Sequence, residues 1–166
     1  MKTGGYLLSF RLAAASTGRD QFGSPTPTWW KSCDPTLARQ ITDPIGNRQS
    51  DSTGYVMKLM KLPFDTIMTS EYCRCKQTAE YFNLGVPIKE YQALTYYVYD
   101  ESNRYTNTMN LYASKAVTVK NYTGVTHAGF LVFQTLRHLQ ACSGVLPAIN
   151  KKHLQSQAKK NLPYNK

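Results

Sequence analysis

Residues 69–80 read TSEYCRCKQTAE, and this stretch decides the fold of the chain. The Thr-Ser pair is a typical helix N-cap and Glu71 suits a first turn, so a helix is predicted from here to about Phe82. Arg74 falls near the start of that helix. A helix N-terminus carries unpaired N–H groups and partial positive charge. Arg74 and the N-terminus of this helix therefore form one part of a candidate anion site.

Two more basic groups follow predicted strands. Residues 6–11 are predicted to form a buried strand that ends on Arg11, and residues 124–126 a strand that ends before His127. Ligands of open α/β sheets bind beyond the carboxyl ends of the strands. Arg11, Arg74 and His127 are therefore expected at one edge, where guanidinium forks match phosphate oxygens. Taken singly, each also fits a surface ion pair or a structural histidine.

Strands and helices alternate along the rest of the chain. Asp43 and Pro44 predict a helix start with Asp43 as the N-cap, Gly46 and Gly54 weaken that helix, and Gly85 is the predicted end of the next one. The partly buried face of the helix that starts at Asp43 is assigned to the apolar residues at positions 45, 56, 59 and 60. The other predicted elements are a surface loop over 13–30, strands within 62–68 and 87–94, and helices over 103–116 and 129–140.

This alternation indicates a three-layer α/β/α domain with a mainly parallel sheet. The chain of 166 residues is long enough for one such domain, assigned to residues 1–145. Residues 146–166 are assigned to a basic tail, because residues 151–166 hold five lysines and no acidic residue.

The motifs of the candidate site resemble those of the histidine phosphatase superfamily, also called the phosphoglycerate-mutase-like family. That family opens on a strand ending in Arg-His-Gly or Arg-His-Ala, continues with Ser-Ser…Arg-Cys…Gln-Thr-Ala-Glu, and has a late His-Gly-Gly or His-Ala-Gly. The matching segments here are residues 11–13 (RLA), 69–80 and 126–129 (THAG). The resemblance covers residues 4–133 and implies the histidine-phosphatase fold.

The resemblance also implies roles for individual residues. Arg11, Arg74 and His127 are expected to bind a phosphoryl group, and Asp100 or Glu101 to protonate the leaving oxygen, with no cofactor and no metal. The family's nucleophile is the histidine of the first motif, and Leu12 stands at that position. A leucine side chain has no lone pair, so the covalent phosphohistidine route is lost.

Three functions are compatible with this sequence. The first is a pseudophosphatase that binds phosphate or a phosphomonoester, and the second an active phosphohydrolase with His127 as nucleophile or base. The third is a basic interaction protein, because a net charge of +10 from 20 basic and 10 acidic residues attracts acidic partners. Nucleic acid is disfavoured as a ligand, since no RNA-binding or helix-turn-helix motif is found. The sequence does not predict an oligomeric state.

The four cysteines leave the compartment open. Their spacing does not match a zinc site, and a bridge between Cys73 and Cys75 is disfavoured by their separation. Cys33 and Cys142 pair with each other, or each pairs with one of the other two, or all four are thiols. No apolar run reaches the roughly 20 residues of a membrane span. Residues 29–35 are similar to those of bacterial exported relatives, so a periplasmic or secreted location with the signal peptide outside this chain is one expectation.

Overall fold

The computed structural model describes residues 1–16, 19–115 and 118–126, together with the backbone of 133–135. These residues form a five-stranded sheet in the order β3-β2-β4-β1-β5. The strands are β1 (Tyr6–Arg11), β2 (Phe64–Thr69), β3 (Ile88–Glu90), β4 (Asn121–Thr126) and β5 (Phe133–Thr135). The first four strands run parallel, and β5 joins the free edge of β1 in the antiparallel direction. The expected mainly parallel sheet is confirmed.

The central strand β4 aligns the ends of its two neighbours. In the register of the sheet, Arg11 of β1 lies opposite Thr126, and Thr69 of β2 lies opposite Val125. The pairing continues one residue further on each side, because Leu12 N–H donates to the Thr126 carbonyl at 2.9 Å and Ser70 N–H to the Val125 carbonyl at 3.2 Å. The carboxyl ends of these strands therefore meet at one edge of the sheet.

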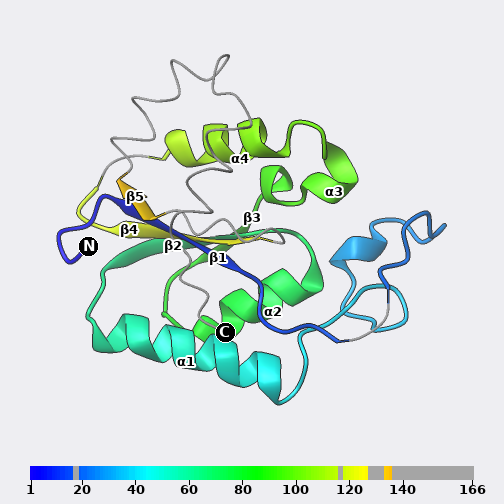
Figure 1. Ribbon diagram of the computed structural model, residues 1–166, viewed down its shortest axis with the longest axis horizontal. Helices are drawn as coiled ribbons and strands as arrows, with labels where there is room; N and C mark the ends of the chain where they lie inside the picture. The colour runs from blue at the N-terminus through cyan, green and yellow to red at the C-terminus, as the bar shows by residue number, and fades with distance from the viewer. Residues whose placement is uncertain (17–18, 116–117, 127–132, 136–166) are drawn as a thin grey trace, which may run out of the picture.

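Helices cover both faces of the sheet (Figure 1). The helices α1 (Ile45–Leu59) and α2 (Cys73–Phe82) pack together on one face, and α3 (Tyr96–Tyr99) and α4 (Arg104–Ala113) lie on the other. Short 3-10 turns form at η1 (Trp29–Lys31) and η2 (Gln92–Leu94).

Alternate strand residues supply two cores, as the period of a β-strand requires. Leu8, Ile67 and Val125 belong to one core, and Leu7 and Met68 to the other. The expected three-layer α/β/α architecture is confirmed. Within the described ranges, none of the helices has both the length and the apolar character needed to cross a membrane.

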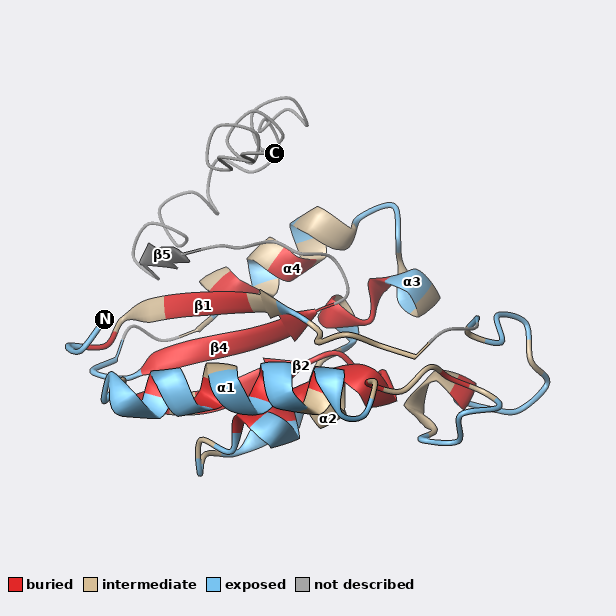
Figure 2. Ribbon diagram, turned by 60° about the horizontal axis from the view of Figure 1, so that its bottom comes forward, coloured by how far each residue is buried: buried red, intermediate tan, exposed pale blue. Residues whose placement is uncertain are grey.

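The predicted buried face of α1 is wrong. Ile45, Val56, Leu59 and Met60 are all exposed, and Figure 2 shows the outward side of α1 in pale blue. The buried residues are Gly46, Ser50, Gly54 and Met57. The reason is close packing: a Cβ at Gly54 would collide with the backbone carbonyl of Phe82 at the end of α2. The glycines expected to weaken α1 are the residues that allow it to approach its neighbours.

The predicted helix ends also shift. Pro44 and not Asp43 is the N-cap of α1, and Asp43 instead accepts a hydrogen bond from the Asn47 side chain at 2.7 Å. α2 begins at Cys73 and not at residue 69, because Glu71 N–H is held by Thr95 Oγ1 at 2.9 Å and the segment before the helix stays extended. α2 is ended by Asn83, in the left-handed conformation with φ 47°, and not by Gly85.

Other predicted segments are shorter or of another type. The strand expected over 87–94 is confined to β3. The helix expected over 129–140 is wrong for residues 133–135, which form the strand β5 and pair with Tyr6 to Leu8. An extended segment there satisfies backbone groups that the edge of β1 would otherwise leave unpaired. The proposed tail over 146–166 lies outside the described residues, so the domain boundary stays a prediction.

One cysteine pairing that the sequence left open is present in the structure. Cys33 and Cys73 form a disulfide with their Cα atoms 5.3 Å apart, which joins the long loop after β1 to the start of α2. Cys75 is a buried thiol. Cys142 lies outside the described residues.

The glycine contact between α1 and α2 can be tested by one methyl group. We expect Gly54→Ala to lower the free energy of unfolding by about 1–3 kcal/mol, the usual cost of overpacking a tight contact. Urea unfolding measures it, with Ser52→Ala on the exposed side of α1 as the control, expected to change stability by less than about 0.5 kcal/mol. Equal stability of the two variants would contradict the close helix packing.

Candidate functional site

A cavity of about 610 Å³ opens at the carboxyl end of β1. Three of its lining residues were predicted from the sequence: Arg11, Leu12 and Arg74. The remaining lining residues come from the loop after β1 and from facing helices and loops: Ala13, Ala14, Ala15, Asp20, Phe22, Arg39, Gln49 and Tyr97. His127, the third predicted phosphate ligand, lies outside the described residues.

The backbone after β1 donates hydrogen bonds to side chains of both helices of the adjacent layer. Ala13 N–H donates to Thr78 Oγ1 of α2 at 3.1 Å, and Ala14 N–H donates to Gln49 Oε1 of α1 at 2.8 Å. Leu12, between these residues and Arg11, is partly buried and packs against the core that includes Leu8. Leu12 also lines the cavity, so the residue that follows Arg11 is apolar there.

Arg74 is buried and already binds a carboxylate. Its Nη1 and Nη2 atoms donate to the two carboxylate oxygens of Asp20, each at 2.7 Å, and its guanidinium lies 4.5 Å from the ring centroid of Tyr72. Asp20 Oδ1 also accepts the backbone N–H of Arg39 at 3.1 Å. This is the paired, charge-assisted geometry in which arginine binds oxyanions.

Arg39 is a lining residue that the sequence analysis missed. Its Nε donates to the backbone carbonyl of Ser16 at 2.6 Å, which fixes the side chain beside the loop after β1. It lies in a segment without strand or helix periodicity, so no spacing in the sequence points to it. Three arginines and one aspartate give the described lining a net formal charge of +2.

Arg11 differs from the other two arginines because it is exposed. In the described part of the chain, no carboxylate forms an ion pair with it. Arg11 and Arg74 come from different elements and line one cavity, and among the described residues only Arg74 of the three lining arginines forms an ion pair with a carboxylate.

The structure does not bring Asp100 or Glu101 to the cavity lining. Asp100 accepts hydrogen bonds from Asn103 N–H and from the Asn107 side chain, both at 3.1 Å, which ties it to the start of α4. The bonds from Asn103 and then Asn107 hold the pKa of Asp100 below its usual value, the opposite of what a proton donor needs. Glu101 forms an exposed ion pair with Arg104 at 3.5 Å.

Cys75, beside Arg74, is not a substitute nucleophile. Burial raises the pKa of its thiol to about 12, so the reactive thiolate is absent at neutral pH. Its side chain belongs to the core beneath the sheet and does not line the cavity.

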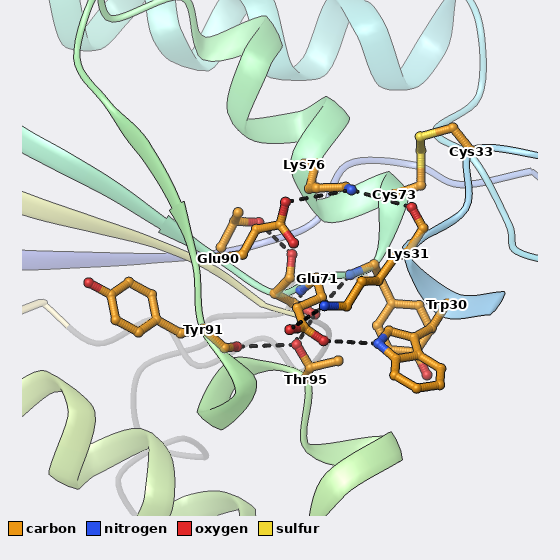
Figure 3. A network of polar contacts seen from close by, with 12 residues as sticks. Trp30, Lys31, Cys33, Glu71, Cys73, Lys76, Glu90, Tyr91 and Thr95 are labelled. Carbon is orange, nitrogen blue, oxygen red and sulfur yellow. Dashed lines mark hydrogen bonds and ion pairs between the residues drawn. A yellow bond between two sulfur atoms is a disulfide. The ribbon is translucent and has the colours of Figure 1, made fainter. Parts of the chain in front are cut away.

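A second polar network lies next to the start of α2, the helix that carries Arg74, and Figure 3 shows its centre at Glu71. The Glu71 carboxylate accepts hydrogen bonds from Trp30 Nε1 at 2.9 Å and from the Tyr99 hydroxyl at 2.8 Å, and Lys31 Nζ lies 3.0 Å away. Burial raises the pKa of Glu71, but the bonds from Trp30, Tyr99 and Lys31 lower it by more. With the Cys33–Cys73 disulfide, this network fixes η1 to the start of α2.

This sheet order, with helices on both faces and an arginine at the end of β1, is the histidine-phosphatase fold. The structure is similar to that of a candidate phosphohistidine phosphatase SixA from Nakamurella multipartitia, with a TM-score of 0.55 and 19% identity over 76% of this chain and 60% of that one. This chain therefore spans less than two thirds of that protein.

Two further solved structures show the same likeness. A candidate SixA from Agrobacterium tumefaciens has a TM-score of 0.53 and 16% identity over 98% of this chain and 87% of that one. The protein histidine phosphatase SixA complexed with tungstate has a TM-score of 0.52 and 17% identity over 82% and 74%. No protein-family model and no curated protein matches the sequence. At these identities the likeness concerns the fold.

The ionised state of Glu71 leads to a pH-dependent prediction. Because its pKa is lowered on folding, the stabilisation is present above its ordinary value of 4.5 and is lost as the pH falls through the lowered value. We expect Glu71→Gln to lower the free energy of unfolding by about 1–3 kcal/mol at pH 7, and by less below pH 4.

Urea unfolding at several pH values measures this difference. Glu80→Gln, on the exposed side of α2, is the matched control and is expected to change stability by less than about 0.5 kcal/mol. If Glu71→Gln lowers the free energy of unfolding by the same amount at all pH values, the charge of the Glu71 carboxylate does not stabilise the protein.

Proposed function

We propose that this chain binds phosphate or a phosphomonoester in the arginine-lined cavity and is a pseudophosphatase without the nucleophilic histidine. The observation that carries the proposal is that Arg11 and Arg74 line one cavity next to Leu12. The bidentate contact of Arg74 with Asp20 supports it, because this guanidinium is already oriented for two oxygens of one anion. The similar SixA structure that contains tungstate, a tetrahedral oxyanion, supports it as well.

The size and lining of the cavity favour an ester over inorganic phosphate. About 610 Å³ lies within the range of small-molecule sites, which run from roughly 300 to 1,000 Å³. Phe22 and Tyr97 add two aromatic rings to the lining, and Phe22 is 61% exposed. The arginines would bind the phosphoryl group, and the rest of the cavity would hold the group esterified to it.

With Leu12 in place of a histidine, the cavity could bind a phosphoryl group without hydrolysing its ester. The arginines would stabilise a phosphoryl dianion by charge and hydrogen bonds, which requires no covalent step. A phosphohistidine intermediate would require a nitrogen lone pair where the chain has a leucine. His127 is proposed as a further phosphate ligand from its motif alone. The function proposed is therefore recognition of a phosphorylated ligand with little or no hydrolysis.

Binding can be measured by isothermal titration calorimetry with phenyl phosphate. We expect Arg11→Ala to weaken binding at least tenfold, since it removes a charge-assisted contact worth about 1.5–3 kcal/mol. Arg48→Ala, an exposed arginine of α1 outside the cavity lining, is the control. Arg11→Ala is the decisive variant, because Arg74→Ala also leaves Asp20 buried without its partner. Unchanged affinity in Arg11→Ala would contradict the proposal.

Turnover tests the pseudophosphatase part. We expect the wild type to hydrolyse p-nitrophenyl phosphate no faster than a blank, and Leu12→His to gain at least about 100-fold, because loss of a nucleophile costs several powers of ten in rate. Equal, substantial rates in the two proteins would instead favour an active phosphohydrolase with another nucleophile, such as His127.

A further inference from the structure

Asp20 occupies the Arg74 guanidinium with the geometry of a ligand. It lies 54 residues before Arg74 in the sequence, yet each of its oxygens is 2.7 Å from one terminal nitrogen of that arginine. The side chains of Arg74 and Asp20 are 5% and 8% exposed. The terminal N–H fork of Arg74 is thus filled by a carboxylate of the chain itself.

A bound phosphoryl group would compete for the same place. Arg74 as a whole is 4% exposed, so its guanidinium has little surface left for a second anion while Asp20 stays. Two like charges in contact with the same guanidinium repel strongly, because the effective dielectric constant there is well below that of water. That repulsion would oppose the gain from a charge-assisted contact between the ligand and Arg74. A phosphoryl dianion and the ionised Asp20 carboxylate therefore do not bind Arg74 at the same time.

The surroundings of Asp20 allow it to leave. Arg19, Gln21 and Phe22 are all exposed, so the chain around Asp20 runs along the surface. Gln21 N–H donates to the Leu37 carbonyl at 3.0 Å, which tethers the loop independently of the carboxylate. Displacing the Asp20 carboxylate would break its contacts with Arg74 and with the Arg39 N–H, and both of these residues belong to the cavity lining.

We infer that Asp20 is an internal competitor of the phosphoryl ligand: an oxyanion binds Arg74 only by displacing the Asp20 carboxylate. This inference rests on the proposed function and specifies how that site selects its ligand. Displacement makes binding of any oxyanion weaker by the free energy of the Asp20–Arg74 contact. Inorganic phosphate then binds weakly, and an ester that also fills the rest of the cavity has the advantage.

The test is phosphate binding by Asp20→Asn. The amide has the same shape and still accepts the Arg39 N–H, but it has no charge to hold Arg74. We expect at least tenfold tighter binding of inorganic phosphate than in the wild type by isothermal titration calorimetry, and a larger rise in melting temperature with phosphate. Asp34→Asn is the matched control, because its exposed carboxylate is bonded to Thr36 and the same charge is removed; its affinity should stay within twofold.

The possible outcomes separate this inference from the proposed function. If the wild type binds phosphate through Arg11 but Asp20→Asn binds it equally or more weakly, Asp20 holds Arg74 in place for the ligand and the inference is overturned. If no variant binds phosphate or phenyl phosphate, the proposed function fails together with it. Should Asp20→Asn not fold, Asp20→Ser removes the same carboxylate in a smaller side chain and must show the same gain.

Discussion

Parallel pairing of β4 with both β1 and β2 is the constraint on which the rest of the structure depends. All six residues of β4 are buried, and its register places the carboxyl ends of its neighbours at one edge of the sheet. Arg11 leaves that edge directly, while Arg74 follows from the start of α2. A slip of one residue would turn every side chain of a strand to the other face, so the register that builds the cores also builds the cavity.

The cavity separates binding chemistry from catalytic chemistry. Three arginines of the lining carry donors suited to an oxyanion, Asp20 occupies one of them, and Leu12 has neither a donor nor a lone pair. The start of α2, which carries Arg74, is joined to η1 by the Cys33–Cys73 disulfide and by the hydrogen bond from Trp30 to Glu71. A positively charged lining with Leu12 beside its arginines suits the proposed recognition of a phosphoryl group, and the Asp20 carboxylate sets how strongly a ligand must compete for Arg74.

The strand ends could be predicted from the sequence because strand, polar residue and helix cap are local signals. These local signals were enough to predict the parallel α/β class, β1, β2 and the positions of Arg11 and Arg74. Contacts between residues far apart in the sequence could not be predicted in this way. The glycine face of α1 depends on α2, β5 depends on the free edge of β1, and Asp20 and Arg39 reach the cavity from irregular loops. Asp100 was chosen as a candidate proton donor from its place in the sequence, which did not reveal its bonds to Asn103 and Asn107 or its absence from the described cavity lining.

The proposed function has two parts: the arginine cavity binds a phosphomonoester, and the protein does not transfer its phosphoryl group. A ³¹P NMR titration of phenyl phosphate with the protein tests both parts in one sample. We expect a saturable shift or broadening of the ester resonance that Arg11→Ala abolishes, with no inorganic phosphate and no phosphohistidine signal over hours. Growth of either new signal, or an ester resonance that never responds to the protein, would contradict it.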